Sequence, residues 1–123
     1  MLFENTTHKE YYIDYTENME TAARVSHTLA LILQTIRSGY VYGFDIMDVT
    51  GLPSGTIYPA LRRLEKDSLV RGEWEDSRIA VREERPPRRY YKLTRQGKDV
   101  LASAVERYPL LARLAPEEKA ARR

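Results

Sequence analysis

The chain has 123 residues and a mass of 14.3 kDa, with 42% hydrophobic residues, which is the size of one domain with short appendages. It has no cysteine, which excludes a disulfide framework and a thiolate metal site, and no apolar run near the ~18 residues of a membrane span. Because the first ten residues lack the basic-then-apolar order of a signal peptide, we expect a cytoplasmic protein.

The formal net charge of +2 conceals an asymmetry along the chain. Residues 1–50 carry seven acidic and three basic residues, whereas residues 51–98 carry twelve basic and seven acidic ones. A basic middle in a nearly neutral chain indicates one face for a polyanion, although such an excess is also typical of ordinary solvated surface.

The N-terminal residues contain an aromatic cluster without a clear period, formed by Tyr11, Tyr12, Ile13 and Tyr15. Tyrosine is enriched at interfaces, so this arm is expected to contact a neighbouring subunit; the alternative is an arm folded on its own domain. From Thr16 to Ile36 the apolar residues recur at steps of three and four and predict one long helix. Its early turns around Met19 extend beyond a small core, toward a partner.

A shorter helix is predicted over Phe44–Val49, with Phe44 and Met47 facing inward. A turn at residues 50–53 then leads into a second helix that ends near Lys66. In that helix Ser54 and Thr56 are the candidate N-caps. Its inward face is predicted to hold Ile57, Ala60, Leu61 and Leu64, and its outward face Gly55, Thr56, Pro59, Arg62, Arg63 and Lys66, with Tyr58 at the flank.

Two helices joined by a glycine-containing turn, the second basic on its outer face, are typical of a helix-turn-helix. The runs Val70–Trp74 and Tyr90–Leu93 predict two antiparallel strands, and the loop between them is rich in arginine, which together make a wing. A last helix follows from a Thr94 cap to about Tyr108. Its apolar stripe and the leucines after Pro109 are predicted to be paired with a partner.

Three runs carry a resemblance to a known family: YGFDI at residues 42–46, GLPSGTIYPALRRLE at residues 51–65 and RRYYKLTRQG at residues 88–97. In these runs the chain resembles the PadR family of bacterial transcriptional regulators. The resemblance implies a mainly α fold with a small β-hairpin wing, a homodimer, and operator binding, often as a repressor. Some members bind small aromatic effectors between subunits, so the resemblance allows such a ligand here.

The expected organisation is an arm with the start of the long helix over residues 1–22, a winged helix-turn-helix over 23–98, a dimerisation helix over 99–114 and a frayed tail over 115–123. Arginines on the helix are expected to read bases or bind phosphate, and those on the wing to enter a minor groove. The expected DNA contacts are Pro53, Ser54, Gly55, Thr56, Tyr58, Arg62, Arg63, Lys66, Arg85, Arg88 and Arg89. The expected dimer contacts are Tyr11, Tyr12, Tyr15, Met19, Leu101, Val105, Leu110, Leu111 and Leu114.

The sequence does not favour a catalytic site. The two histidines, His8 and His27, have no cysteine or partnered serine nearby in the sequence, and Glu83-Glu84 lies among arginines that balance its charge. We therefore predict a regulator that is not an enzyme and needs no cofactor or metal. The rival is a winged helix used as a protein-interaction module, which an apolar outer face on the second helix would favour.

Overall fold

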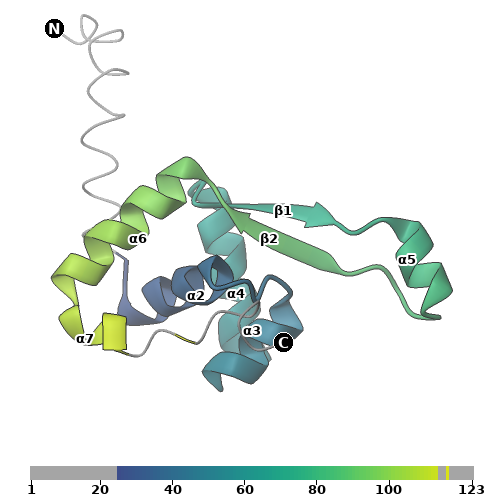
Figure 1. The fold of residues 1–123 in the computed structure, drawn as a ribbon, viewed down its shortest axis with the longest axis horizontal. Coiled ribbons are helices and arrows are strands. Elements are labelled where there is room, and N and C mark those ends of the chain that lie inside the picture. Colours follow the sequence, from purple (N-terminus) through teal and green to yellow (C-terminus); the bar gives the residue numbers. More distant parts are fainter. Residues whose placement is uncertain (1–24, 114–115, 117–123) are drawn as a thin grey trace, which may run out of the picture.

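The computed structural model describes residues 25–113 and Pro116. Figure 1 shows helices gathered into one body from which a two-stranded hairpin projects, with a short helix at its tip. In chain order the elements are α2 (His27–Arg37), α3 (Gly43–Thr50), α4 (Ser54–Lys66), β1 (Val70–Trp74), α5 (Ser77–Arg82), β2 (Arg89–Leu93), α6 (Arg95–Arg107) and α7 (Pro109–Arg113).

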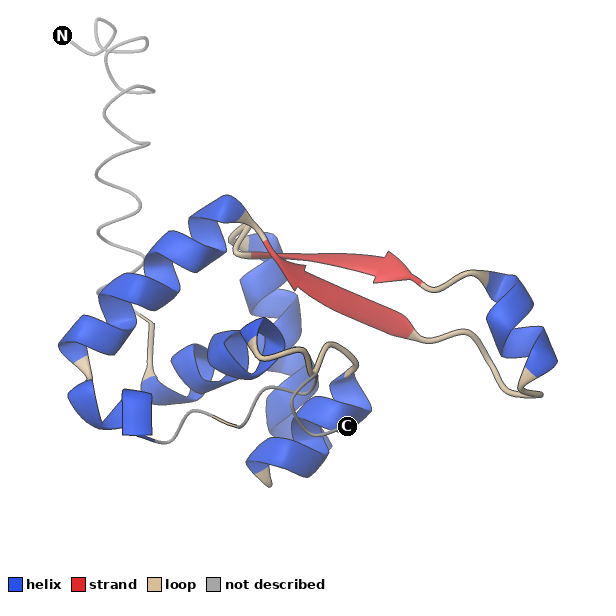
Figure 2. Ribbon diagram, viewed as in Figure 1, coloured by secondary structure: helices blue, strands red, loops and turns tan. Residues whose placement is uncertain are grey.

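The two strands are antiparallel, with Val70 opposite Leu93 and Trp74 opposite Arg89. Figure 2 shows how far this hairpin extends from the helices. A mostly helical body with a projecting antiparallel hairpin confirms the predicted winged helix-turn-helix. Within the described residues, no helix has the length and apolarity needed to cross a lipid bilayer.

The core lies between α2, α4 and α6 and is closed by the first residue of the wing, Val70. The inward face predicted for α4 is confirmed, since Ile57, Leu61 and Leu64 are buried and Ala60 packs against them. The fully buried side chains of the largest volume include Ile32, Leu33, Ile46, Ile57, Leu61, Leu64, Leu69 and Leu101.

The prediction of one unbroken helix from Thr16 to Ile36 is wrong. Residues Val25 and Ser26 are not helical, and Ser26 is extended, with φ −76° and ψ 169°. The Ser26 Oγ accepts the Leu29 N–H at 3.2 Å and so caps the start of α2. The Thr16 start and the contacts expected of Met19, Tyr11, Tyr12 and Tyr15 lie outside the described residues.

The inward position of Phe44 is also wrong, because its side chain is 70% exposed. Helix α3 begins one residue earlier than predicted, and Gly43 and Ile46 form its buried face. At ~100° per residue, Phe44 then points away from that face. Met47 packs against the core as expected.

The predicted caps of α4 are wrong as well. Pro53 occupies the cap position in an extended conformation, and no side chain caps the helix. Ser54 is instead the first helical residue and Thr56 lies within the first turn. Pro59 therefore lies well inside the helix, where its missing N–H leaves the carbonyl of exposed Gly55 without its intrahelical donor.

Two leucines expected on the surface are buried in the chain's own core. Leu101 on α6 is fully buried and Leu111 on α7 is 4% exposed. The reason is that Pro109 does end α6, but it also starts α7, which turns back onto α2 and α6. Leu110 remains 66% exposed, and Leu114 lies outside the described residues.

Thr94 joins the end of α4, the wing and α6, and it caps α6 as predicted. Its O–H donates to the Ser68 carbonyl at 2.7 Å, while its Oγ1 accepts the Gly97 N–H at 2.9 Å. The Thr94 N–H donates to the Leu69 carbonyl at 3.1 Å. The two segments are so close that a Cβ added at Gly97 would lie 2.0 Å from the Leu69 carbonyl oxygen.

We expect Gly97→Ala to lower the free energy of unfolding by about 2–4 kcal/mol, because the new methyl group meets backbone that cannot turn aside. The matched control is Gly55→Ala, where a Cβ would find no atom within 4 Å. Its unfolding free energy should change by less than about 1 kcal/mol. Urea unfolding at one fixed protein concentration measures both; equal stabilities would contradict the close approach at Gly97.

Candidate nucleic-acid interface

Helix α4 brings the predicted contact residues of the helix onto one surface. Ser54, Gly55, Arg62, Arg63 and Lys66 are exposed. Pro53 just before the helix is also exposed, Thr56 is half-buried, and Tyr58 is 40% exposed. The outer face thus combines small residues at its N-terminal end with cations toward its C-terminal end, as the sequence predicted.

The three cations of this face differ in whether they have an ion-pair partner among the described residues. Arg63 faces Asp67 one turn later, with its Nε 3.7 Å from the carboxylate, a contact that is exposed and weak. Within the described part of the chain, Arg62 and Lys66 have no ion-pair partner. These groups are therefore available to an external anion without first breaking a strong internal contact.

Tyr58 has a packing role that the sequence did not reveal. Its ring lies over the first residue of α3, so that a Cβ added at Gly43 would be 2.6 Å from the ring. The side chain therefore helps to set the position of α3 against α4 while keeping part of its surface exposed. A glycine directly before Phe44 was the available sign of this contact.

Arg85 does not present its guanidinium to solvent, contrary to the expectation for a wing contact. Its side chain is 19% exposed and forms a two-pronged ion pair with Glu75. It also donates to Glu83 and to the Pro86 carbonyl at 3.1 Å. Arg85 thus closes the loop at the wing tip, and its charge is already neutralised there.

Arg89 is also held within the molecule. Its guanidinium donates to Glu65 of α4 at 2.8 Å and lies 5.3 Å from the centre of the Trp74 ring. It crosses the β1 backbone at Gly72, where an added Cβ would be 2.7 Å from the guanidinium nitrogens. Arg89 therefore ties the hairpin of the wing to the candidate recognition helix.

Arg88 is the remaining wing arginine of the predicted set, and it is exposed. Its guanidinium lies 5.7 Å from the centre of the Tyr42 ring, which in turn meets the Tyr90 ring edge-on. Tyr42 and Tyr90 also form an isolated antiparallel bridge, so the connector before α3 supports the wing strand. The spacing of these aromatic residues along the chain does not reveal this support.

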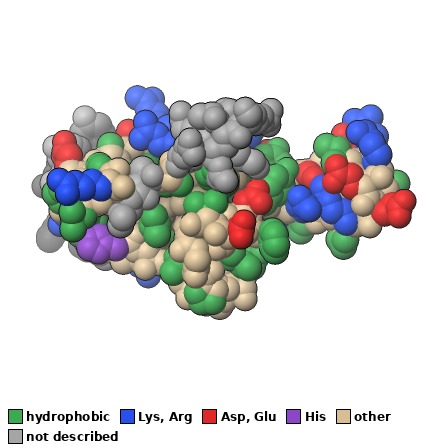
Figure 3. Space-filling model, turned by 60° about the horizontal axis from the view of Figure 1, so that its bottom comes forward, with side chains coloured by type: hydrophobic (Ala, Val, Ile, Leu, Met, Phe, Trp, Pro, Cys, Tyr) green, Lys and Arg blue, Asp and Glu red, His purple; other side chains and the backbone are tan. Residues whose placement is uncertain are grey.

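The wing tip carries a helix that the sequence analysis missed. Asp76 caps α5 by accepting the Arg78 N–H at 2.9 Å, and its carboxylate also pairs with the Arg78 side chain at 2.6 Å. Figure 3 shows basic and acidic side chains intermixed over this tip. An aspartate before a short apolar run was the available signal, but the two prolines that follow favoured an extended loop.

The comparisons with known proteins decide which family this is. The PadR-like family of transcriptional regulators matches residues 32–103, from within α2 to within α6. The chain belongs to the PadR family. The predictions of a PadR-like fold and of a transcriptional regulator that is not an enzyme are thereby confirmed.

Solved PadR structures share this fold. A regulator from Clostridium difficile R20291 gives a TM-score of 0.60 at 24% identity, covering 72% of this chain and 94% of that chain. One from Eggerthella lenta DSM 2243 gives 0.58 at 26%, covering 85% and 91%. A PadR-like transcription factor from Bacteroides fragilis gives 0.55 at 28%, covering 78% and 93%. Among curated proteins, no match was found.

The contact between Arg85 and Glu75 predicts that the order of this PadR wing depends on pH. Hydrogen bonds from the Arg85 side chain, with help from the Arg88 N–H, hold the pKa of Glu75 below its ordinary value despite burial, which raises it. The contact between Arg85 and Glu75 therefore stabilises the wing fully at pH values above the ordinary glutamate pKa of 4.5. This stabilisation is lost as the pH falls through the lower pKa that Glu75 has in the folded protein.

We therefore expect the wing tip to open as the pH falls below the ordinary carboxylate value of 4.5, earlier than the helical body. Amide hydrogen exchange of residues 75–88 measures the opening. Glu75→Gln should remove most of the pH dependence and leave the tip open at neutral pH. Glu83→Gln is the matched control, because Glu83 is exposed and pairs with the outer side of Arg85. Equal behaviour of the two variants would contradict the role given to Glu75.

Proposed function

We propose that this PadR regulator is a repressor that binds an inverted-repeat operator in duplex DNA as a homodimer. The observation that supports this most is the outer face of α4, where the exposed Arg62, Arg63 and Lys66 follow a helix start of small residues. A helix of this kind fits the major groove, and the dimer would exclude other proteins from the DNA it covers.

Each part of the helix has a separate role in this proposal. Arg62 and Arg63 reach base edges, where a guanidinium bonds guanine in a bidentate manner. Lys66 lies at the end of the helix and bonds phosphate. At the entry, Pro53 and Gly55 let the backbone come close, while Ser54, Thr56 and Tyr58 supply hydroxyl groups for phosphate and set the register.

The wing contributes one exposed contact and two supporting residues. Arg88 is the arginine that we place in the minor groove or on its phosphates. Arg85 and Arg89 act indirectly, since Glu75 and Glu65 hold them. They keep the wing folded and at a fixed position relative to α4, which sets where Arg88 meets the DNA.

The proposed dimer contacts are those of the expected residues that are not buried in the chain's own core. Leu110 is 66% exposed, and Val105 is half-buried against the core with part of its surface free. Tyr11, Tyr12, Tyr15, Met19 and Leu114 remain proposed contacts from the residues that the structure does not describe. A two-fold axis would place two recognition helices about 34 Å apart, one duplex turn. A small aromatic effector bound by this dimer remains part of the proposal.

The DNA proposal predicts a steep dependence of affinity on salt. If each subunit neutralises ~3–5 phosphates, the dimer should show a log–log slope of roughly −5 to −9. Arg62→Ala or Arg63→Ala should cost about 1–3 kcal/mol on the preferred sequence, because a bidentate base contact is lost. Fluorescence anisotropy on a duplex selected from random DNA measures both effects.

The matched control is Arg107→Ala, which removes an exposed arginine from α6, outside the proposed face. It should leave the affinity and the preferred sequence unchanged. A slope near zero would favour the rival interaction module and refute DNA binding. An equal loss on every sequence would assign the substituted arginine to phosphate instead of a base.

The dimer proposal is tested by Leu110→Ser, which should weaken self-association by removing exposed apolar surface at low risk to the fold. Ala112→Ser is the matched control, as an exposed residue of the same helix. Deleting residues 1–15 tests the tyrosine arm separately. Sedimentation equilibrium measures association, and an intact chain that is monomeric at tens of micromolar would refute the dimer.

A further inference from the structure

The helix at the tip of the wing, α5, is built as a rigid unit. The Arg85 N–H donates to the Ala80 carbonyl at 3.1 Å. The Glu84 N–H donates to the Val81 carbonyl at the same distance of 3.1 Å. This pair of bonds is the Schellman pattern that ends a helix, and it adjoins the largely buried ion pair of Arg85 with Glu75. The tip therefore presents its exposed side chains in a fixed arrangement.

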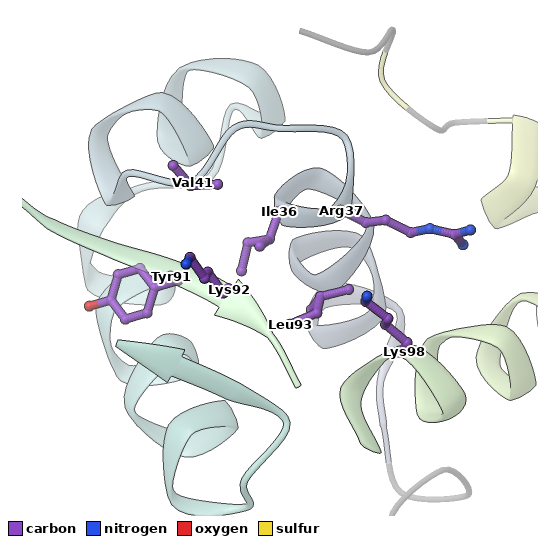
Figure 4. A pocket seen from close by; sticks show the side chains of 7 residues that line it. All are labelled: Ile36, Arg37, Val41, Tyr91, Lys92, Leu93 and Lys98. Carbon is purple, nitrogen blue, oxygen red and sulfur yellow. The ribbon is translucent and has the colours of Figure 1, made fainter. Parts of the chain in front are cut away.

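The two strands of the wing hold this tip away from the helical body. At their base the Tyr91 N–H of β2 donates to the Val41 carbonyl at 2.9 Å. Figure 4 shows Ile36 of α2 and Leu93 of β2 lining one hollow there. In Figure 1, α5 and α7 lie at opposite ends of the molecule. In a dimer formed through Leu110 of α7, the two wing tips would therefore lie far from the two-fold axis, where they meet a neighbouring dimer first.

The tip does not share the basic excess of α4. Residues 75–88 hold four basic and four acidic residues, whereas α4 holds three basic residues and one acidic one. A helix with its side chains is also about 10–12 Å across, which is wider than the minor groove of about 6 Å. Helix α5 would therefore stay outside a groove that the Arg88 side chain enters. Its surface suits a protein better than a polyanion.

Three side chains at the end of α5, those of Val81, Arg82 and Glu84, are exposed and available to a partner. The Val81 side chain is 76% exposed. Within the described residues, Arg82 and Glu84 form no ion pair, and Arg82 acts on Asp76 only as a nearby charge. Glu84 has a φ of 56°, a conformation in which glycine would be less strained. A carboxylate kept at such a position indicates a role outside the fold.

We propose that the wing tip binds the wing tip of a second copy of this chain about a local two-fold axis. The Val81 side chains of the two copies form the centre of the contact, and Arg82 of each copy pairs with Glu84 of the other. A two-fold contact needs a surface that is complementary to itself, and two opposite charges beside one apolar side chain meet that need. A purely acidic or purely basic partner would leave one of the two charges unpaired.

The contact is small, so it is weak between free dimers and matters where two dimers lie side by side on DNA. Interfaces below about 1,200 Å² are typical of weak encounters. Dimers on neighbouring operators are held at a roughly millimolar effective concentration, at which a weak contact is populated. The second dimer should therefore bind about ten-fold more tightly than the first. This consequence rests on the proposed function, whereas the contact itself requires no DNA.

The first test follows the amide chemical shifts of the DNA-free full chain as its concentration rises to about 1 mM. The shifts of residues 79–84 should depend on concentration. Arg82→Glu and Glu84→Arg should each remove this dependence, because like charges then face each other across the axis. The double variant, and an equal mixture of the two single variants, should restore it. The matched control is Arg71→Glu, the same charge reversal at an exposed arginine of β1, which should change nothing.

A further variant separates the contact from the folding of the tip. Glu84→Gly removes the carboxylate and relieves the left-handed backbone, so the tip should stay folded while the dependence on concentration weakens. Amide hydrogen exchange of residues 75–88 checks that the tip is intact.

The second test uses duplexes that carry one selected operator, or two operators spaced in one-base-pair steps over one helical turn. Two operators should fill cooperatively at the spacings that bring the tips together, and Arg82→Glu should abolish this without changing the affinity for one operator. The proposal is overturned if the shifts of residues 79–84 do not depend on concentration, if the double variant fails to restore that dependence, or if the two operators fill independently at every spacing.

Two other outcomes separate this contact from the proposed function. Weaker binding of Arg82→Glu to one operator would overturn the tip contact, because the tip would then bind phosphate. A failure of the unaltered chain to bind one operator would refute the proposed function instead, and the DNA-free shifts would still decide whether the tips bind each other.

Discussion

The hydrogen bonds of Thr94 hold α4, the wing and α6 of this PadR protein together as a unit. Ser68 leaves α4 in a left-handed conformation, with φ 63°, which is uncommon for a residue other than glycine. The Thr94 hydroxyl holds the Ser68 carbonyl in that turn, and the same oxygen caps α6. The end of α4, the base of the hairpin and the first turn of α6 are therefore positioned by one side chain and by the close approach of Gly97.

A second constraint is electrostatic and separates the arginines of the basic middle into two groups. Arg85 and Arg89 are paired with Glu75 and Glu65, residues distant in sequence, and they fix the geometry of the wing. Arg62 and Arg88 are exposed and outside such pairs in the described residues. The net positive charge of a segment therefore does not measure the charge available to DNA, because some of its arginines are already paired with glutamates of the same chain.

What the sequence predicted well is what depends on local periodicity. The inward face of α4, the strand Val70–Trp74 and the Thr94 cap each follow from the residues within one element. Phe44 was misplaced because Gly43, Ile46 and Met47 form the inward face of α3, and the next residue after Gly43 lies ~100° around the helix from that face. The Ser54 and Thr56 caps failed because the helix starts earlier than predicted, with Pro53 at the cap position.

The errors at the site have a different cause. Whether Arg85 faces DNA or Glu75 depends on a fold in which residues ten positions apart meet across the wing tip. The burial of Leu101 and Leu111 likewise depends on α7 turning back after Pro109. Hydrophobicity identified these residues as candidates for burial but did not specify against which surface, the chain's own or a partner's.

The link between Arg89 and Glu65 has a consequence for how such a protein can be regulated. It joins the wing to α4 across the face of β1, while the Tyr91–Val41 bond joins the outer edge of β2 to the connector. The wing is thus held at two places, and its position is determined by contacts outside the proposed DNA face. A molecule that alters either contact would move Arg88 relative to Arg62 without touching these two residues, provided that it binds the two positions of the wing unequally.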